Sequence, residues 1–258
     1  MPPRAAPTHF LCLPLVTSIS RPQLARSLGA FGADVTSPES FAIPEQAVRP
    51  LGTLHLTLGV MSLQGDARLE GAIALLRSLV PSPAVSAILQ GNTQQQQLGR
   101  PDALQELPQQ HQQEQHKPAR SLSITLRGLH SIQPPAKATV LYAPPIDDGG
   151  TLLQLCQHLR SAFQEAGFMD KEDRPLLLHA TVVNTIYVKG AARSGPGPSR
   201  GKRNDKLTID AREILNRYDD YLWMQDVPVE KVAICRMGAK EQPDGEVAYE
   251  AEAEVELR

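Results

Sequence analysis

The alternation of hydrophobic and polar residues predicts short strands interleaved with amphipathic helices. The two-residue period of a strand and the 3.6-residue period of a helix distinguish the two kinds of segment. Ser20, followed by Pro22, marks the start of the first helix, and Gly167 stops a later one. The pattern predicts strands at residues 8–16, 53–60, 121–132, 137–145, 178–185, 230–237 and 246–257, and helices from residue 20 onward and over residues 66–80, 151–166 and 211–218.

The order of these elements repeats, which predicts an α+β fold built from two related lobes. In each half a helix leads into a strand that carries the triplet His-x-Thr. The runs at 121–132 and 137–145 are interpreted as a hairpin. In residues 246–257 glutamates alternate with small or apolar residues, which is typical of an edge strand protected from pairing with other molecules. We expect one domain over residues 8–258.

Two segments interrupt this order. Residues 90–120 are rich in glutamine and nearly free of aromatic residues, so they are predicted to be a disordered surface insertion. Residues 190–206 are rich in glycine, proline, serine and basic residues, which predicts a flexible basic loop that contacts phosphates or acts as a weak nuclear signal. A solvated loop with incidental charge is an equally good interpretation.

Charge, cysteine content and hydropathy limit the kinds of partner and the cell compartment that we expect for this protein. The formal net charge is -2, so any contact with nucleic acid has to come from a local patch rather than from the whole surface. Cys12, Cys156 and Cys235 are widely spaced within apolar segments and are interpreted as buried thiols of a reducing compartment. No run approaches the roughly 20 apolar residues of a membrane span, so we expect no membrane partner and a nuclear or cytoplasmic location.

The two His-x-Thr strands carry the candidate chemistry. At strand period, His55 and Thr57 share one face of the first, and His179 and Thr181 share one face of the second. If the lobes turn these faces inward, the two imidazoles flank a groove. One can be the base and the other the acid of phosphodiester cleavage, because histidine titrates near neutral pH. The threonine hydroxyls can bind phosphate oxygens, and the reaction needs no metal or cofactor.

A single histidine on a strand is more often a structural residue than a catalyst. The repetition of the triplet at matching places favours catalysis or phosphate binding over chance. His9, His130 and His158 belong to no such repeat and are interpreted as structural or surface residues. His111 and His116 lie in the Gln-rich segment without other metal-binding side chains nearby.

Four segments, THFLCLPL, LGTLHLTLGVMSL, LLLHATVVNTIY and VAICRMGA, resemble the two-histidine (2H) phosphoesterase superfamily. The resemblance is closest to the kinase A anchor protein phosphoesterase-like branch, which includes the activating signal cointegrator complex subunit 1. It implies a bilobal, LigT-like fold with two pseudo-symmetric lobes whose antiparallel sheets flank a central cleft. It also implies metal-independent action on RNA or nucleotide phosphodiesters, such as 2′,3′-cyclic phosphates or 2′,5′-linked oligonucleotides. The motif positions of the family fall on His55, Thr57, His179 and Thr181.

Recognition and partners follow less directly. Tyr142 and Tyr187 are candidates for stacking a base, and Lys189 for binding a distal phosphate, whereas Trp223 is interpreted as packing. We expect a monomer that binds RNA or a nucleotide. One alternative is a scaffold that holds a nucleotide or RNA end within a transcription or repair complex without turnover. Another is RNA end joining, which uses the same cleft in reverse.

Overall fold

The computed structural model describes residues 6–91, 122–172, 174–188 and 207–257. Lys189, the basic loop and the Gln-rich segment lie outside them, apart from Gln90, which ends a helix, and the Gly91 that follows it. The helices are α1 (Arg21–Thr36), α2 (Asp66–Leu79), α3 (Pro83–Gln90), α5 (Thr151–Glu165) and α6 (Arg212–Arg217). The strands are β1 (His9–Pro14), β2 (His55–Met61), β3 (Ser123–Arg127), β4 (His130–Ser131), β5 (Val140–Ala143), β6 (Pro145–Ile146), β7 (Ala180–Asn184), β8 (Leu222–Pro228), β9 (Lys231–Arg236), β10 (Lys240–Glu241), β11 (Val247–Ala248) and β12 (Ala251–Glu256).

A seven-stranded antiparallel sheet organises the molecule, in the order β12-β9-β1-β2-β7-β5-β4. One half of the sheet contains β1 and β2, and the other contains β5 and β7. The halves meet at β2 and β7, where Leu56 lies opposite Ala180. The predicted α+β class with antiparallel sheets is confirmed. The predicted edge strand is also confirmed, because β12 lies at one end of the sheet.

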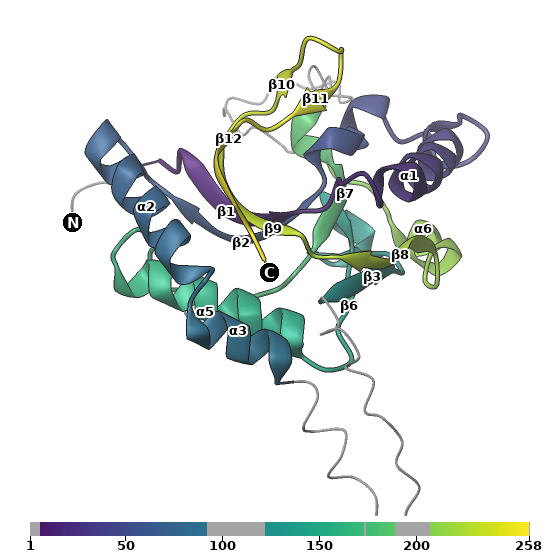
Figure 1. The fold of residues 1–258 in the computed structure, drawn as a ribbon. Coiled ribbons are helices and arrows are strands. Elements are labelled where there is room, and N and C mark those ends of the chain that lie inside the picture. The colour runs from purple at the N-terminus through teal and green to yellow at the C-terminus, as the bar shows by residue number, and fades with distance from the viewer. Residues whose placement is uncertain (1–5, 92–121, 173, 189–206, 258) are drawn as a thin grey trace, which may run out of the picture.

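The two faces of this sheet are different. The central part of one face is apolar, and its residues Leu11, Leu13, Leu56 and Leu58 join the main core with Leu155 of α5. Figure 1 shows α2, α3 and α5 together on one side of the sheet and the β10–β11 hairpin on the other. The second face carries a smaller apolar cluster, formed by Phe10, Cys12, Ala233 and Cys235 with Tyr249 packed against it. This second face is therefore the one left for polar chemistry.

The predicted hairpin is confirmed, but it is divided between two sheets. β4 pairs with β5 in the large sheet, whereas β3 pairs with β6, which begins at Pro145, and with β8 in a separate three-stranded sheet. The chain changes sheets at Gly128, whose φ of 81° is a conformation that favours glycine. A Cβ there would lie 2.6 Å from the backbone oxygen of Asp219. Both the backbone conformation and the lack of space therefore favour glycine at this turn between the two sheets.

Trp223 of β8 anchors the second sheet to α1. It is 2% exposed, and its indole N–H donates to the backbone oxygen of Gly128 at 2.8 Å. Its ring lies 5.0 Å from that of Phe31 in α1, so the interpretation of Trp223 as a packing residue is confirmed. Among the described residues, no single helix has the length and apolar composition of a membrane span. Only α2 and α3 taken together, bent by 51°, reach those values.

Candidate active site

The two His-x-Thr motifs lie side by side on one sheet face. They occupy neighbouring strands of the same sheet, rather than facing each other across a groove between two sheets as expected. The register that pairs Leu56 with Ala180 places His55 beside Thr181 and Thr57 beside His179. Leu56 and Ala180 point into the core and are fully buried, so the four motif residues point together to the opposite face.

The two imidazoles are held in the same way. Nδ1 of His55 is 2.8 Å from the backbone oxygen of Thr53, and Nδ1 of His179 is 2.8 Å from that of Leu177. A carbonyl oxygen can only accept, so Nδ1 carries a proton in both rings. In the neutral ring this leaves the lone pair on Nε2, and in the charged ring Nε2 carries the second proton. Each histidine therefore presents Nε2 as a proton acceptor or donor.

The threonines complete a symmetric arrangement. Thr57 and Thr181 are half-buried, and their hydroxyls have no hydrogen-bond partner among the residues that the structure describes. β-Branching and the strand backbone restrict the rotation of both side chains. The result is two hydroxyls and two imidazole nitrogens in a small area, related by an approximate twofold axis between Leu56 and Ala180.

Their surroundings make the two histidines unequal. The His55 ring packs against Phe10, with ring centroids 4.8 Å apart, and against the edge of Tyr249, at 5.3 Å. The pKa of His55 is lowered from 6.5 to about 4, mainly by this burial, with smaller contributions from the neighbouring His179 and Arg49 and an opposing effect of the Thr53 carbonyl. His55 is therefore neutral at pH 7, with a free lone pair.

His179 has an aromatic neighbour on β5, the strand that lies beside β7 away from β2. Tyr142 of β5 lies opposite Thr181, and the ring centroids of Tyr142 and His179 are 5.5 Å apart in an edge contact. Tyr142 is only 7% exposed. His130 of β4 pairs with Tyr142, at 5.7 Å between ring centroids, so it extends the row of rings along the same face. No sequence pattern indicated that His130 would lie near the motifs, because its strand is only two residues long.

A pocket of about 190 Å³ borders His55. Its floor is the small apolar cluster with Cys12 and Cys235, whose sulfur atoms are 3.8 Å apart, and both thiols are buried as predicted. Charged side chains stand around it: Arg21, Lys231, Glu246 and Glu254. A larger pocket of about 510 Å³ lies near the start of α2 and contains none of the four motif residues. No group of metal-binding side chains occurs among the described residues.

Two residues beside His55 were not expected from the sequence. Arg49 and Tyr249 contact each other, with Arg49 Nη2 donating to the Tyr249 hydroxyl at 3.4 Å. The guanidinium of Arg49 also lies over the ring of Tyr187, at 3.8 Å from its centroid. Tyr187 is 42% exposed, and it is linked to the surroundings of His55 through Arg49. No sequence signal marks Arg49, since it reaches the site through a backbone contact with β7.

Comparison with known proteins identifies the family. The AKAP7 2′5′ RNA ligase-like domain matches residues 7–257. C15D4.13c of Schizosaccharomyces pombe is 28% identical over 139 residues, which cover 54% of this chain and 59% of that protein. Among solved structures, TT0787 of Thermus thermophilus is 17% identical with a TM-score of 0.48, covering 97% of this chain and 98% of that chain. LigT of Escherichia coli, complexed with 3′-AMP, is 15% identical with a TM-score of 0.47 and the same coverage. The chain belongs to the AKAP7 2′5′ RNA ligase-like domain family.

Proposed function

We propose that this protein is a phosphodiesterase that cleaves RNA or nucleotide phosphodiester bonds by acid–base catalysis. One observation carries the proposal: two imidazoles, each with Nδ1 on a carbonyl two residues back, share a sheet face with two threonine hydroxyls that have no hydrogen-bond partner among the described residues. Family membership supports it, because the family name describes RNA-phosphate chemistry. The reaction needs no metal, since the side chains themselves supply the base, the acid and the phosphate ligands.

The two histidines take different roles in this mechanism. His55 is neutral, because burial lowers its pKa to about 4, so its Nε2 accepts the proton of the attacking water or ribose hydroxyl. His179, protonated on both nitrogens, donates from Nε2 to the departing oxygen. The bond from the attacking oxygen to phosphorus forms as the bond to the leaving oxygen breaks. Exchange with solvent after product release returns each histidine to its starting state.

Thr57 and Thr181 stabilise the phosphate as charge builds on its non-bridging oxygens. Their hydroxyls lie on opposite sides of the line that joins the two imidazoles, so each can donate to a different phosphate oxygen. Such fixed donors act more strongly here than in water, because a buried aromatic side chain lies on each side, Phe10 by His55 and Tyr142 by His179. Removal of one donor of this kind costs about 10²–10³ in rate in other enzymes.

We also propose that, within the family, the chain lies nearest to the activating signal cointegrator complex subunit 1. The support is the similarity of the four quoted segments, which include both motif strands. Partners in a transcription or repair complex and a nuclear or cytoplasmic site of action follow from this placement. Affinity purification of the tagged protein from its own cells tests it, and recovery of no such complex under mild salt would refute it.

A substrate panel tests the catalytic proposal. Wild type, His55→Ala and His179→Ala are incubated in EDTA with 2′,3′-cyclic nucleotides, 2′,5′-oligoadenylate and short 3′,5′-RNA. We expect wild type to cleave at least one class and each variant to lose about 100-fold or more. Folded wild type that binds a nucleotide but cleaves nothing would instead support the scaffold alternative.

A further inference from the structure

Arg49 is a buried cation without a described counter-ion. It is 8% exposed, and its backbone N–H donates to the Val182 oxygen of β7 at 2.9 Å. No carboxylate of the described residues lies within 4.0 Å of its guanidinium. Arg160, whose side chain is also largely covered at 12% exposure, is paired with Glu172 at 2.9 Å. The two arginines are buried to a similar extent, but of the two only Arg160 has a carboxylate partner in the part of the chain that the structure describes.

The groups that do contact Arg49 are neutral. The ring of Tyr187 lies 3.8 Å from its guanidinium carbon, and the hydroxyl of Tyr249 accepts a long hydrogen bond of 3.4 Å. The pKa of Tyr249 is raised to about 12, mainly by burial and also by the neighbouring Tyr187 hydroxyl, so Tyr249 is uncharged at neutral pH. A π face and a hydroxyl offset part of the cost of burying a cation, but they supply no negative charge.

A phosphate supplies what is lacking. Its oxygens match the planar fork of a guanidinium and accept two parallel hydrogen bonds from it. The hydroxyls of Tyr187 and Tyr249, which lie within reach of each other, are further donors for the same group. Bound phosphate would therefore convert an uncompensated buried charge into a pair with several charge-assisted hydrogen bonds.

The position of Tyr249 indicates which phosphate this is. Its ring touches His55 while its hydroxyl touches Arg49, so the Tyr249 side chain extends from the catalytic histidine toward the arginine. The scissile phosphate belongs between the two histidines, where the threonine hydroxyls are. We propose that Arg49, Tyr187 and Tyr249 bind a second phosphate, a terminal monoester on the nucleotide next to the scissile bond. This inference rests on the proposed function and defines its substrate class: nucleotides that carry an end phosphate.

A binding experiment tests the subsite without relying on turnover. Adenosine 5′-monophosphate and adenosine are titrated calorimetrically into wild type, Arg49→Met, Arg49→Lys and Arg21→Gln. We expect wild type to bind the monophosphate about 10–100-fold more tightly than adenosine, as hydrogen bonds to a charged group allow. In Arg49→Met this ratio should fall to near one, and in Arg49→Lys, which keeps the charge but not the fork, it should be intermediate.

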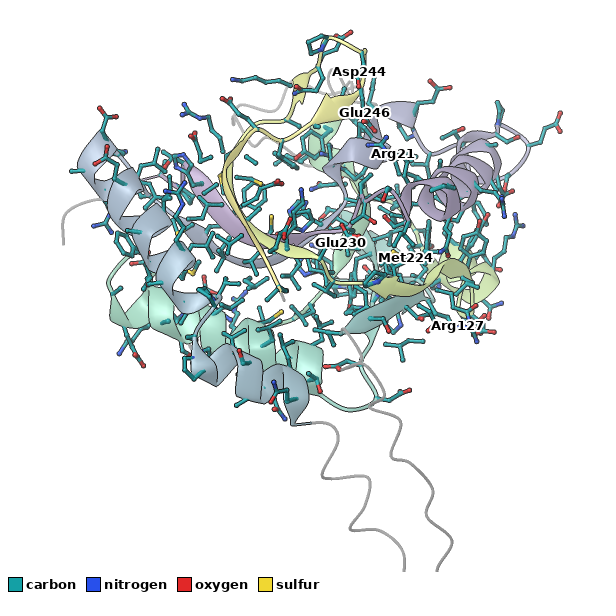
Figure 2. The ribbon with its side chains drawn as sticks, viewed as in Figure 1. Arg21, Arg127, Met224, Glu230, Asp244 and Glu246 are labelled. Atoms are coloured by element: carbon teal, nitrogen blue, oxygen red, sulfur yellow. The ribbon has the colours of Figure 1, made fainter. Side chains whose placement is uncertain are left out.

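Arg21→Gln is the matched control. Arg21 also lines the pocket beside His55, but it is already paired with Glu246 at 2.8 Å. Figure 2 shows these two residues near the β10–β11 hairpin. Substitution of Arg21 should leave the ratio as in wild type. If Arg49→Met does not fold, as judged by its thermal unfolding, the ratio in Arg49→Lys decides. Equal binding of the two ligands by wild type, or a preference that persists in the folded Arg49 variants, would overturn the inference.

Kinetics separate this inference from the proposed function. A 2′,5′-linked diadenylate is supplied with and without a 5′-terminal phosphate. Cleavage of both at equal kcat/KM supports the phosphodiesterase and refutes the subsite. If neither substrate is cleaved but calorimetry shows a preference for the monophosphate that depends on Arg49, the phosphodiesterase is refuted on this substrate. The subsite is then retained.

Discussion

Tyr249→Ala should raise the pKa of His55. The pKa is about 4 rather than 6.5, mainly because the ring is buried between Phe10 and Tyr249. The lowered pKa corresponds to roughly 3 kcal/mol between the two protonation states, at about 1.4 kcal/mol per unit. Tyr249 supplies one of the two aromatic walls, so its removal should restore roughly one unit. Tyr249→Phe keeps the wall and should leave the pKa close to 4.

Nuclear magnetic resonance titration of the His55 C2 proton from pH 3.5 to 8 measures this directly, without a substrate. The acid limb of a kcat/KM profile should shift with it, since a base must be neutral to act. The wild-type limb is then expected near pH 4, and that of Tyr249→Ala near pH 5. If wild-type His55 titrates near 6.5, or if Tyr249→Ala and Tyr249→Phe titrate alike, burial does not set the protonation state of His55.

Further predictions concern the motif, acid stability and packing. Thr57→Val and Thr181→Val should each lower kcat by about 100-fold in steady-state kinetics, while KM changes little. A rise of KM by about the same factor with kcat unchanged would assign the hydroxyls to ground-state binding instead. Because the pKa of His55 is lower in the folded state, the unfolded state takes up a proton first, so the free energy of unfolding should fall as the pH drops from about 6.5 toward 4. Because His55 is still partly accessible, we expect the free energy of unfolding to fall by roughly 2 kcal/mol over this range. Urea unfolding at each pH measures this loss, which should be absent in His55→Gln. Gly59→Ala should destabilise by about 1–3 kcal/mol, because its Cβ would lie 2.5 Å from Met169 Sδ. Gly29→Ala in α1, with nothing within 4 Å, should instead stabilise by about 0.5–1 kcal/mol, and equal unfolding midpoints for the two variants would contradict this.

The helices and the motif strands could be predicted because local patterns determine them. The helix over Asp66–Leu79 begins and ends within one residue of the predicted 66–80. The helix over Thr151–Glu165 is followed by the predicted stop Gly167, which has a φ of 73°. In both motif strands the alternation of residues also indicated the correct shared face for each His-Thr pair. Short-range periodicity thus identified the candidate catalytic side chains.

The relation between the two motif strands could not be predicted, since it depends on strand pairing across 124 residues of sequence, from Leu56 to Ala180. The same alternation of residues fits two different arrangements: two lobes whose His-Thr faces oppose each other, and one sheet in which the two strands are neighbours. Arg49 and Tyr249 could not be identified for a related reason. Arg49 comes close to His55 by pairing with β7, and Tyr249 by the return of the chain from β11 to β12. Neither contact leaves a local pattern.

The central claim is that His55 is the base and His179 the acid. A pair of substrates with the same nucleoside tests it most directly, one with an alcohol leaving group and one with p-nitrophenol, which departs without protonation. The account predicts that His179→Ala loses about 100-fold or more on the first and little on the second, whereas His55→Ala loses equally on both. If His179→Ala loses as much on the p-nitrophenyl ester, or if the ester rescues His55→Ala instead, the assigned roles are wrong.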